Sequence, residues 1–456
     1  MEHFYKDDIF DESSFNFKDL YLHIIKNSKN NSKFVEVGSR EGRSSCYMSV
    51  EIANSNKDID FYCIDSWDKL SQPISYQIES DPYNKFLSNM KPVEDYYIPL
   101  KLNSIDASKK FKNNSLDFVF IYPSRNYEEV KNEITHWLPK IKSGGVLAAH
   151  NYSSSEFPHI KMAADEILGE ANLIKVDKCF VYYKDKLNNF PTINVISLKE
   201  SHDRRSSLEK NFLEKSIDLD KVNFHLFDRF KEEDHKITGT QYETLSFDSK
   251  GPLTSHFKAI KNWIKSSSND EDYTFFCEDD FTFSNIKYWN FNWEFFFNRI
   301  PKNWSIVQLV IVREPGYFWV FGDKFRNRCW CDWSCAGYLI KKDFAKRLIK
   351  NYYPEDVFTL EYCGTDKHTR YLELGSSFSP NVETLIFSYL QNEHLYAFNL
   401  FSENIKECPT TAIFVDKKNA DFNVYSYHEC EKFWKNIQHT HQLDYIFSEI
   451  ERQNNG

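Results

Sequence analysis

Short apolar runs alternate with segments of helical periodicity along most of the chain. The apolar runs predict buried strands, because they are short and end at turn-forming residues. The expected strands are residues 33–37, 61–64, 116–121, 146–149, 179–183, 193–198, 273–277, 306–312 and 338–340. The expected helices are residues 42–52, 127–141, 203–215, 253–265 and 343–350. Strands that alternate with helices in this way favour α/β domains with largely parallel sheets.

The clearest helix is expected over residues 127–141. Its apolar residues at helical spacing are Val130, Ile134, Trp137 and Ile141. The pair Gly144-Gly145 follows, and we expect it to turn the chain into the strand at 146–149.

The chain of 456 residues is too long for one ordinary core. The best candidate boundary is the polar stretch Lys184 to Pro191, KDKLNNFP, between two strand-like runs. We therefore predict two domains, 1–187 and 188–456.

Charge and composition exclude some classes of protein. The net charge is −10 and no Lys/Arg-rich run is present, which argues against a nucleic-acid-binding protein. The first residues, MEHFYKDDIFDESS, lack the apolar core of a signal peptide, and the run 306–312 is too short to cross a bilayer. Ten cysteines fit reduced thiols over this length. We expect a cytoplasmic protein without a transmembrane segment, and the oligomeric state stays open.

The first half contains a glycine turn between a strand and a helix. In FVEVGSREGRSS, Glu36, Gly38 and Gly42 lie at this turn, and Asp65 ends the next strand. Glycines let a backbone approach a ligand closely, and the helix N-terminus adds partial positive charge. A carboxylate at Asp65 suits a ribose diol. The alternative is an ordinary tight turn beside a solvated carboxylate.

These residues, with LDFVFIYPSRNYEEVKNEITHWLPKIKSGGVLAAHNY, resemble class I S-adenosylmethionine-dependent methyltransferases of the sugar and small-molecule O-methyltransferase group. The resemblance covers about residues 30–170 and implies a Rossmann-like fold that binds S-adenosylmethionine. The sequence departs from the group where metal and base chemistry are expected. Tyr122, Pro123 and Arg125 replace Asp, Gly and His, and Asn151 replaces a second Asp. Two interpretations stay open, a silent or repurposed domain and an active methyltransferase.

The second half carries its strongest chemical feature in YTFFCEDDFTF. A buried strand runs into Glu278, Asp279 and Asp280, and alternation along a strand places Glu278 and Asp280 on one side. A Mn²⁺ or Mg²⁺ ion held by these two residues would offset their charge and bind a sugar-nucleotide diphosphate. The alternative is a solvated acidic loop.

Four blocks resemble glycosyltransferase family 25, the lipopolysaccharide and collagen galactosyltransferase-like group. They are INVISLKESHDRRSSLEKNF, GPLTSHFKAIKNW, FFCEDDFTF and WSCAGYLIKKDFAKRLI, in this order over about residues 193–350. The resemblance implies a GT-A-like fold, a nucleotide-sugar donor and dependence on a divalent metal. The glycine usual before the Ser-His pair is shifted, because Gly251 is followed by Pro252, Leu253 and Thr254.

Position suggests further roles. Arg204 and Arg205 open a helix after the first strand of this half and could contact nucleotide phosphates, or form a solvated helix start. His256 is a candidate donor contact, or a structural histidine. Asp332 is the first candidate base for the acceptor hydroxyl, and Glu361 and Glu383 are its competitors.

Together these features predict an α/β protein of two domains, a Rossmann-like methyltransferase fold followed by a GT-A-like nucleotide-sugar-binding fold. The predicted function is transfer of a sugar from a nucleotide-sugar donor to a glycan or protein hydroxyl, with a degenerate or repurposed N-terminal domain. The alternatives are a bifunctional glycosyltransferase and methyltransferase, and a non-catalytic protein that binds glycans or nucleotides.

Overall fold

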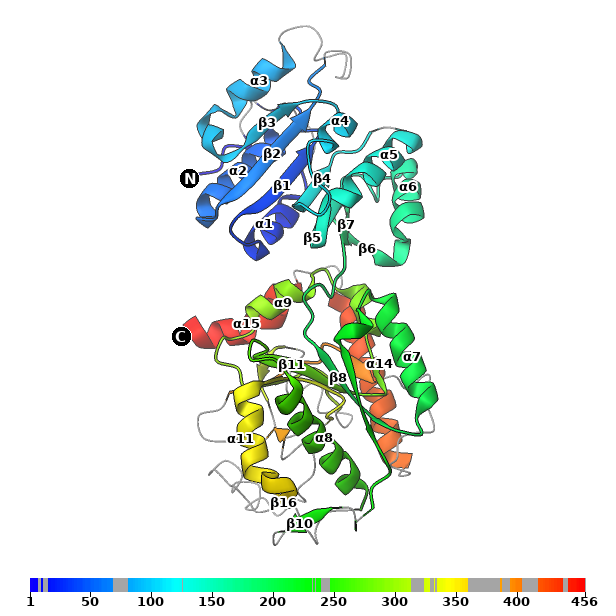
Figure 1. The fold of residues 1–456 in the computed structure, drawn as a ribbon. Coiled ribbons are helices and arrows are strands. Elements are labelled where there is room, and N and C mark those ends of the chain that lie inside the picture. Colours follow the sequence, from blue (N-terminus) through cyan, green and yellow to red (C-terminus); the bar gives the residue numbers. More distant parts are fainter. Residues whose placement is uncertain are drawn as a thin grey trace. The chain divides into compact units, whose positions relative to one another are not determined.

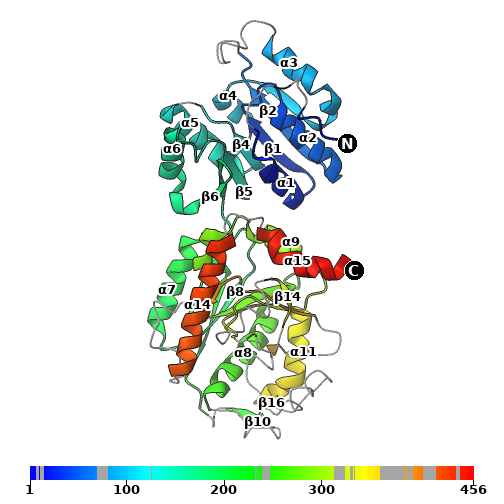
Figure 2. The same ribbon diagram turned by 180° about the vertical axis from the view of Figure 1, so that it is seen from behind.

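The computed structural model shows two compact units (Figures 1 and 2). It describes residues 1–6, 10, 15–68, 81–124, 126–231, 233, 235–238, 247–312, 324–328, 332, 334–359, 386–387, 394–403, 417–437 and 442–455. The first unit contains residues 1–188 together with 287–298 and Gln442, and the second contains the rest. Among the described residues, no helix is long and apolar enough to cross a membrane.

The first unit is built on a seven-stranded sheet in the order β3-β2-β1-β4-β5-β7-β6. Its strands are β1 Ser32–Val37, β2 Ile59–Asp65, β3 Ile98–Lys101, β4 Leu116–Ile121, β5 Ile141–Ala149, β6 Leu173–Val176 and β7 Cys179–Tyr183. Strand β7 runs antiparallel to β5 and β6, and the pairs from β3 to β5 are parallel. The order β3-β2-β1-β4-β5 is that of a Rossmann sheet, so the Rossmann-like fold predicted for this half is confirmed.

Alternation along the strands gives this sheet two apolar faces. The helices of the unit are α1 Lys18–Asn27, α2 Arg43–Ser55, α3 Pro82–Asn89, α4 Ser104–Ser108, α5 Tyr127–Trp137 and α6 Pro158–Leu168. Phe34 and Phe118 pack in the core that contains α1 and α2 residues. Val35 and Val119 pack in the other core, with residues of α5 and α6. Both faces of the sheet are therefore covered.

One predicted helix ends early. Helix α5 ends at Trp137, and Ile141 already begins β5, whereas the apolar spacing predicted a helix through Ile141. The pair Gly144-Gly145 lies inside β5 rather than in a turn before it. Pairing of β4 with β5 shifts register at this place, from Leu116 opposite Ile141 to Phe118 opposite Val146. The glycines therefore mark an irregularity within one long strand.

The segment 287–298 belongs to the first unit, although our sequence-based division placed it in the second domain. The side-chain amide of Asn292 donates to the carbonyl of Gly144 at 2.5 Å, and the backbone N–H of Trp293 donates to the carbonyl of Lys186 at 2.6 Å. The hydroxyl of Tyr183 donates to the carbonyl of Asn290 at 2.5 Å. These contacts tie residues distant in sequence to the end of the first sheet.

The second unit has a seven-stranded sheet in the order β14-β17-β13-β15-β11-β8-β9. Its strands are β8 Ile193–Leu198, β9 Val222–Phe227, β11 Tyr273–Glu278, β13 Ile306–Gln308, β14 Arg326–Asn327, β15 Gly337–Lys341 and β17 Leu395–Ala397. Strand β15 is antiparallel to β11 and β13, whereas β8 is parallel to both β9 and β11. Two small pairs add β10 Lys236–Thr238 with β16 Val357–Thr359, and β12 Phe281–Thr282 with β18 Ser402–Glu403.

Helices lie on both faces of this second sheet. The helices of this unit are α7 His202–Glu214, α8 Phe247–Ser266, α11 Lys342–Tyr352, α14 Lys417–Ile437 and α15 Gln442–Asn455, whereas α9 Trp293–Arg299 belongs to the first unit except for its last residue. Helices α8 and α11 lie on one face and α14 on the other (Figures 1 and 2). The core beneath α8 includes Phe257 and Ile260, which meet Phe276 and Tyr338 of the sheet. The α/β class predicted for this half is thus confirmed.

Candidate functional site

A cavity of about 510 Å³ opens at the carboxyl ends of the neighbouring parallel strands β8, β9 and β11. Ligands of α/β folds bind at this edge of the sheet. The other walls come from the first turn of α7, from residues 228–230 and from the first half of α8. Its ionisable side chains are Arg204, Asp228, Arg229, His235, His256, Lys258, Glu278 and Asp279. The volume lies in the range of roughly 300–1,000 Å³ that small-molecule sites occupy.

Asp279 holds an arginine against the cavity wall. Nη1 of Arg204 lies 2.9 Å from Oδ1 of Asp279, and the hydroxyl of Ser197 donates to Oδ2 at 2.6 Å. Burial raises the pKa of Asp279, while the hydrogen bond from Ser197 and the charge of Arg204 lower it. Arg204 lines the cavity as expected, and its remaining N–H groups can serve an anionic ligand.

Arg205 faces the opposite way. Its guanidinium donates to the hydroxyl of Ser197 at 2.9 Å, to the carbonyl of Lys199 at 2.8 Å and to the carbonyl of Leu198. It is buried and is not among the cavity-lining residues. Adjacent residues of a helix point about 100° apart, so two neighbouring arginines cannot share one wall. The structure therefore corrects the expected phosphate contact of Arg205 to a structural role in the turn between β8 and α7.

His256 joins the cavity to the core of the second unit. It is fully buried, with Nε2 3.0 Å from Oε1 of Glu278 and Nδ1 3.0 Å from the hydroxyl of Tyr338. The side chain of Glu278 retains 32% exposure and lines the cavity. Of the alternatives for His256, the structure shows a hydrogen-bonded histidine that also forms part of the cavity wall.

The acidic triplet is arranged differently from the prediction. Strand β11 ends at Glu278, and Asp279 and Asp280 form the turn before β12, so strand alternation no longer applies to Asp280. The cavity is lined by Glu278 and Asp279, and Asp280 is not among its lining residues. The sequence paired Glu278 with Asp280 because strand alternation was carried past Glu278, where β11 ends.

The carboxylates as placed do not form a divalent-cation site. Both oxygens of Asp279 already have donors, and Arg204 already offsets its charge. In the described part of the chain, no group of three or more Asp, Glu, His or Cys side chains could hold a metal ion. Hard divalent cations need several oxygen ligands in one place. Dependence on Mn²⁺ or Mg²⁺ therefore stays a prediction from family resemblance.

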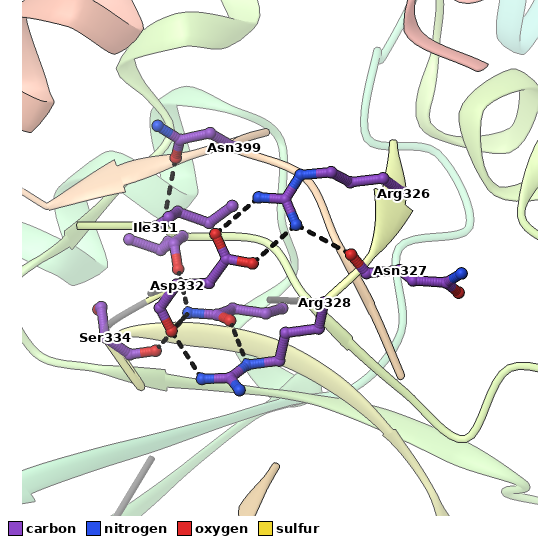
Figure 3. Close-up of polar contacts among 9 residues, drawn as sticks. Ile311, Arg326, Asn327, Arg328, Asp332, Ser334 and Asn399 are labelled. Atoms are coloured by element: carbon purple, nitrogen blue, oxygen red, sulfur yellow. Dashed lines mark hydrogen bonds and ion pairs between the residues drawn. The ribbon is translucent and has the colours of Figure 1, made fainter. Parts of the chain in front are cut away.

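Asp332 is locked in an ion pair (Figure 3). Its carboxylate is fully buried and accepts hydrogen bonds of 2.7 and 2.8 Å from the guanidinium of Arg326. Its backbone carbonyl accepts from Arg328 at 2.6 Å and from the amide of Gln308 at 3.3 Å. A buried carboxylate in a bidentate pair is a poor proton acceptor, because the pair stabilises its ionised form.

The structure bears on the three residues that we considered as the catalytic base. Asp332 is buried and is not among the cavity-lining residues, so the structure does not bring it together with Glu278. Glu361 and Glu383 lie outside the described residues. Sequence reasoning also missed Tyr338 and Lys258, since an apolar strand and a helix face gave no chemical signal at either position.

In the first unit, the glycine turn follows β1 as predicted. Gly38 and Gly42 have φ of +89° and +95°, which favours glycine. A Cβ on Gly38 would lie 2.9 Å from Cβ of Tyr122, and one on Gly42 would lie 2.9 Å from Met90. Contacts inside the protein thus already demand both glycines.

The two acids expected to bind a cofactor are engaged internally. Glu36 is 1% exposed and accepts hydrogen bonds from Tyr21 at 2.7 Å, Ser39 at 2.8 Å and Ser45. Asp65 accepts from the backbone N–H groups of Arg40 at 3.0 Å and Trp67 at 2.9 Å. Burial raises the pKa of Asp65, and these hydrogen bonds lower it. Glu36 is therefore a structural residue of the turn.

Side chains fill the space above the turn. The guanidinium of Arg40 lies 4.3 Å from the ring centre of Tyr122, and the rings of Tyr122 and His150 are 4.9 Å apart. Burial lowers the pKa of His150 to about 4. Only about 20 Å³ remains beside the turn, lined in part by Phe15 and Phe17. This volume holds about one water molecule, so the side chains as placed leave no open cavity of a cofactor's size beside the turn.

Comparison with known families agrees with both resemblances. Residues 35–152 match the family described as methyltransferase domain, and residues 190–359 match glycosyltransferase family 25 (LPS biosynthesis protein). Methyltransferase domains imply a cofactor of the S-adenosylmethionine type, and glycosyltransferases imply a nucleotide-sugar donor. No curated protein matches the chain.

Solved structures similar to this chain include several O-methyltransferases. NovP has 16% identity and a TM-score of 0.29, with 37% of this chain and 78% of that chain covered. TomG from Streptomyces achromogenes, involved in tomaymycin synthesis, has 12% identity, a TM-score of 0.28 and the same coverage of 37% and 78%. CalS11, a TDP-rhamnose 3′-O-methyltransferase, has 11% identity and a TM-score of 0.28, with 37% and 76% covered. At these TM-scores the likeness supports no functional conclusion.

The family matches carry the identification, since they coincide with the glycine turn in one unit and with the open cavity in the other. Together the two matches indicate a transferase: residues 35–152 match methyltransferase domains, and residues 190–359 match glycosyltransferase family 25.

Proposed function

We propose that this protein transfers a sugar from a nucleotide-sugar donor to a hydroxyl group of a glycan or protein, and that the donor binds in the cavity of the second unit. One observation carries the proposal. The cavity of about 510 Å³ lies at the carboxyl ends of β8, β9 and β11, inside the segment that matches glycosyltransferase family 25. This edge is where α/β folds bind nucleotides.

The cavity walls supply the contacts that such a donor needs. Arg204 in the first turn of α7 and Lys258 in α8 are basic groups of the cavity wall, and we assign the donor phosphates to them. Arg204 lies in the first turn of α7, where the helix dipole also favours an anion. Phe227 and Phe230 offer aromatic surface for a nucleobase.

The filled glycine turn of the first unit favours a glycosyltransferase with a non-methylating first unit over a bifunctional enzyme. Tyr122 stands where the resemblance expects a carboxylate, and Arg40 covers it. We therefore propose that the first unit does not transfer methyl groups.

Donor binding can be tested on the full chain. Thermal-shift measurements with UDP-, GDP- and CMP-sugars, each with and without Mn²⁺, should show stabilisation by one nucleotide class. Calorimetry with that donor should show affinity lowered about tenfold or more by Lys258→Gln and by Arg204→Gln, because each loses a charge-assisted contact. Arg452→Gln on α15 is the control, since Arg452 is exposed and pairs with Glu449.

Metal dependence is tested on the same preparation. If Mn²⁺ or Mg²⁺ is needed, excess EDTA should abolish transfer and added Mn²⁺ should restore it. Undiminished transfer in EDTA would remove the metal from the proposal. A chain that neither binds nor transfers any sugar nucleotide would refute the proposed function.

A further inference from the structure

We propose that Tyr338 is a positioning residue that acts through His256 to hold the carboxylate of Glu278 in one orientation toward the cavity. The inference rests on the proposed function, because it concerns a side chain that a bound donor or acceptor would meet. Tyr338 itself lies in β15, behind the cavity wall, and is not a lining residue.

The three side chains form a chain of hydrogen bonds that runs from the core to the cavity. The Tyr338 hydroxyl and Nδ1 of His256 are 3.0 Å apart, as are Nε2 of His256 and Oε1 of Glu278. Tyr338 and His256 are both fully buried, whereas Glu278 remains 32% exposed. The first hydrogen bond joins β15 to α8, and the second joins α8 to β11.

The tyrosine hydroxyl determines which nitrogen of His256 carries the proton. Burial raises the pKa of Tyr338 well above its ordinary value, so its hydroxyl remains protonated. Among the described residues the hydroxyl has one hydrogen-bond partner, Nδ1 of His256, and donation to Nδ1 is the arrangement that satisfies the buried O–H. Nδ1 is then an acceptor, and the neutral ring carries its proton on Nε2.

This tautomer is the one that Glu278 requires. A carboxylate oxygen accepts hydrogen bonds, so Nε2–H donates to Oε1. In the other neutral tautomer a lone pair on Nε2 would face the carboxylate, and the Tyr338 hydroxyl would lose its acceptor. The hydroxyl therefore selects the ring form that holds Glu278 in place, in the way that a hydrogen-bond partner behind a binding group fixes the orientation of that group.

Packing keeps the chain rigid. The ring of Tyr338 stacks on Phe276 with centres 5.6 Å apart and on His256 with centres 5.8 Å apart. Phe387 meets its edge at 5.7 Å. Since the phenol cannot rotate freely, its hydroxyl is preorganised toward Nδ1. With Oε1 held by His256, we assign the contact with a ligand in the cavity to Oε2 of Glu278.

The first measurement is the tautomer of His256 in the full chain. Selective ¹⁵N-histidine labelling, with His256→Gln to assign the resonance, should show a neutral ring with the proton on Nε2 at neutral pH. In Tyr338→Phe, which removes only the hydroxyl, the spectrum should show a second ring form in exchange. A wild-type ring protonated on Nδ1, or a spectrum unchanged by Tyr338→Phe, overturns the proposal.

The second measurement is sugar transfer. Tyr338→Phe should lower kcat about tenfold or more, the size expected when a residue that orients a binding group loses its hydrogen-bond partner. The same change in the His256→Gln background should cost little, because a glutamine amide donates to Glu278 without help from Tyr338. Equal losses in both backgrounds would point to general destabilisation and contradict the positioning role.

A matched control and a separate outcome keep the two proposals distinct. Tyr396→Phe removes another tyrosine hydroxyl of the same sheet. This hydroxyl donates to Oδ1 of Asn303 at 3.2 Å, and neither residue lines the cavity, so kcat should stay unchanged. If the wild-type chain transfers no sugar, the proposed function fails, and the tautomer measurement still decides whether Tyr338 orients His256.

Discussion

Replacement of Asp332 by asparagine separates a structural role from a catalytic one. Asp332 is fully buried and Arg326 is 11% exposed, and two hydrogen bonds of 2.7 and 2.8 Å join them. Asparagine keeps the shape but leaves the guanidinium as an uncompensated buried charge. Loss of one partner of a buried pair costs about 3–5 kcal/mol, and we expect the lower end because the amide oxygen still accepts one bond. For a unit of this size, that cost corresponds to a fall in Tm of roughly 6–12 °C.

The assay is calorimetric melting of the full chain, with sugar transfer measured on the same preparation below the transition. Asp444→Asn is the control, because Asp444 pairs with an arginine, Arg299, but is 43% exposed and should cost less than about 1 kcal/mol. Adding Arg326→Gln to Asp332→Asn should recover part of the loss, since no unpaired charge remains. If Asp332→Asn melts like the wild type and yet transfers sugar far more slowly, Asp332 is the base and the structural assignment is wrong.

Three further outcomes follow from the first unit. Burial raises the pKa of Glu133 from 4.5 to about 7, so its folded form binds a proton more tightly than its unfolded form, and stability falls as pH rises from about 4.5 through 7. Glu133→Gln should therefore raise the melting temperature at pH 8, with a gain in the free energy of unfolding of at most about 3 kcal/mol, and should have little effect at pH 4. A gain that does not depend on pH would contradict this. Calorimetry of the full chain with S-adenosylmethionine should show no saturable binding, and binding weakened by Asp65→Ala would show that the turn opens. A fragment of residues 1–187 lacks 287–298 and should melt below the first unit of the full chain; an equal melting temperature would show that the segment is dispensable.

The hydrophobic pattern was sufficient to predict an element where burial alone decides whether a segment forms a strand. The apolar runs at 116–121, 193–198 and 273–277 became central strands, because only a covered sheet can bury them. The pattern was insufficient where a residue fits the periodicity of one element but pairs as part of another. Ile141 fits the helical spacing of 127–141 but begins β5, since pairing with β4 outweighs the local periodicity.

The same distinction holds for the site. Glu278 and Arg204, which the sequence singled out, both line the cavity, because each lies at or just after the end of a strand that its hydrophobicity makes recognisable. It could not show that β11 ends at Glu278, which decides that Asp279 rather than Asp280 lines the cavity. Nor could it show that Asp332 meets Arg326, because ion pairing within the core depends on the packed fold.

Both units have a strand that runs into a helix at the edge of the sheet, but the space beside this turn is filled in the first unit and open in the second. In each, a central parallel strand, β1 or β8, runs into a helix, and nucleotides bind at such an edge. After β1, Arg40 and Tyr122 occupy that space and leave about 20 Å³. After β8, the pair of Arg204 with Asp279 draws the arginine against the wall, and about 510 Å³ stays open. One arginine therefore closes its site by stacking across it, and the other lies along the wall of an open site. Because fold alone does not determine function, these side chains, rather than the shared topology, direct the search for activity to the second unit.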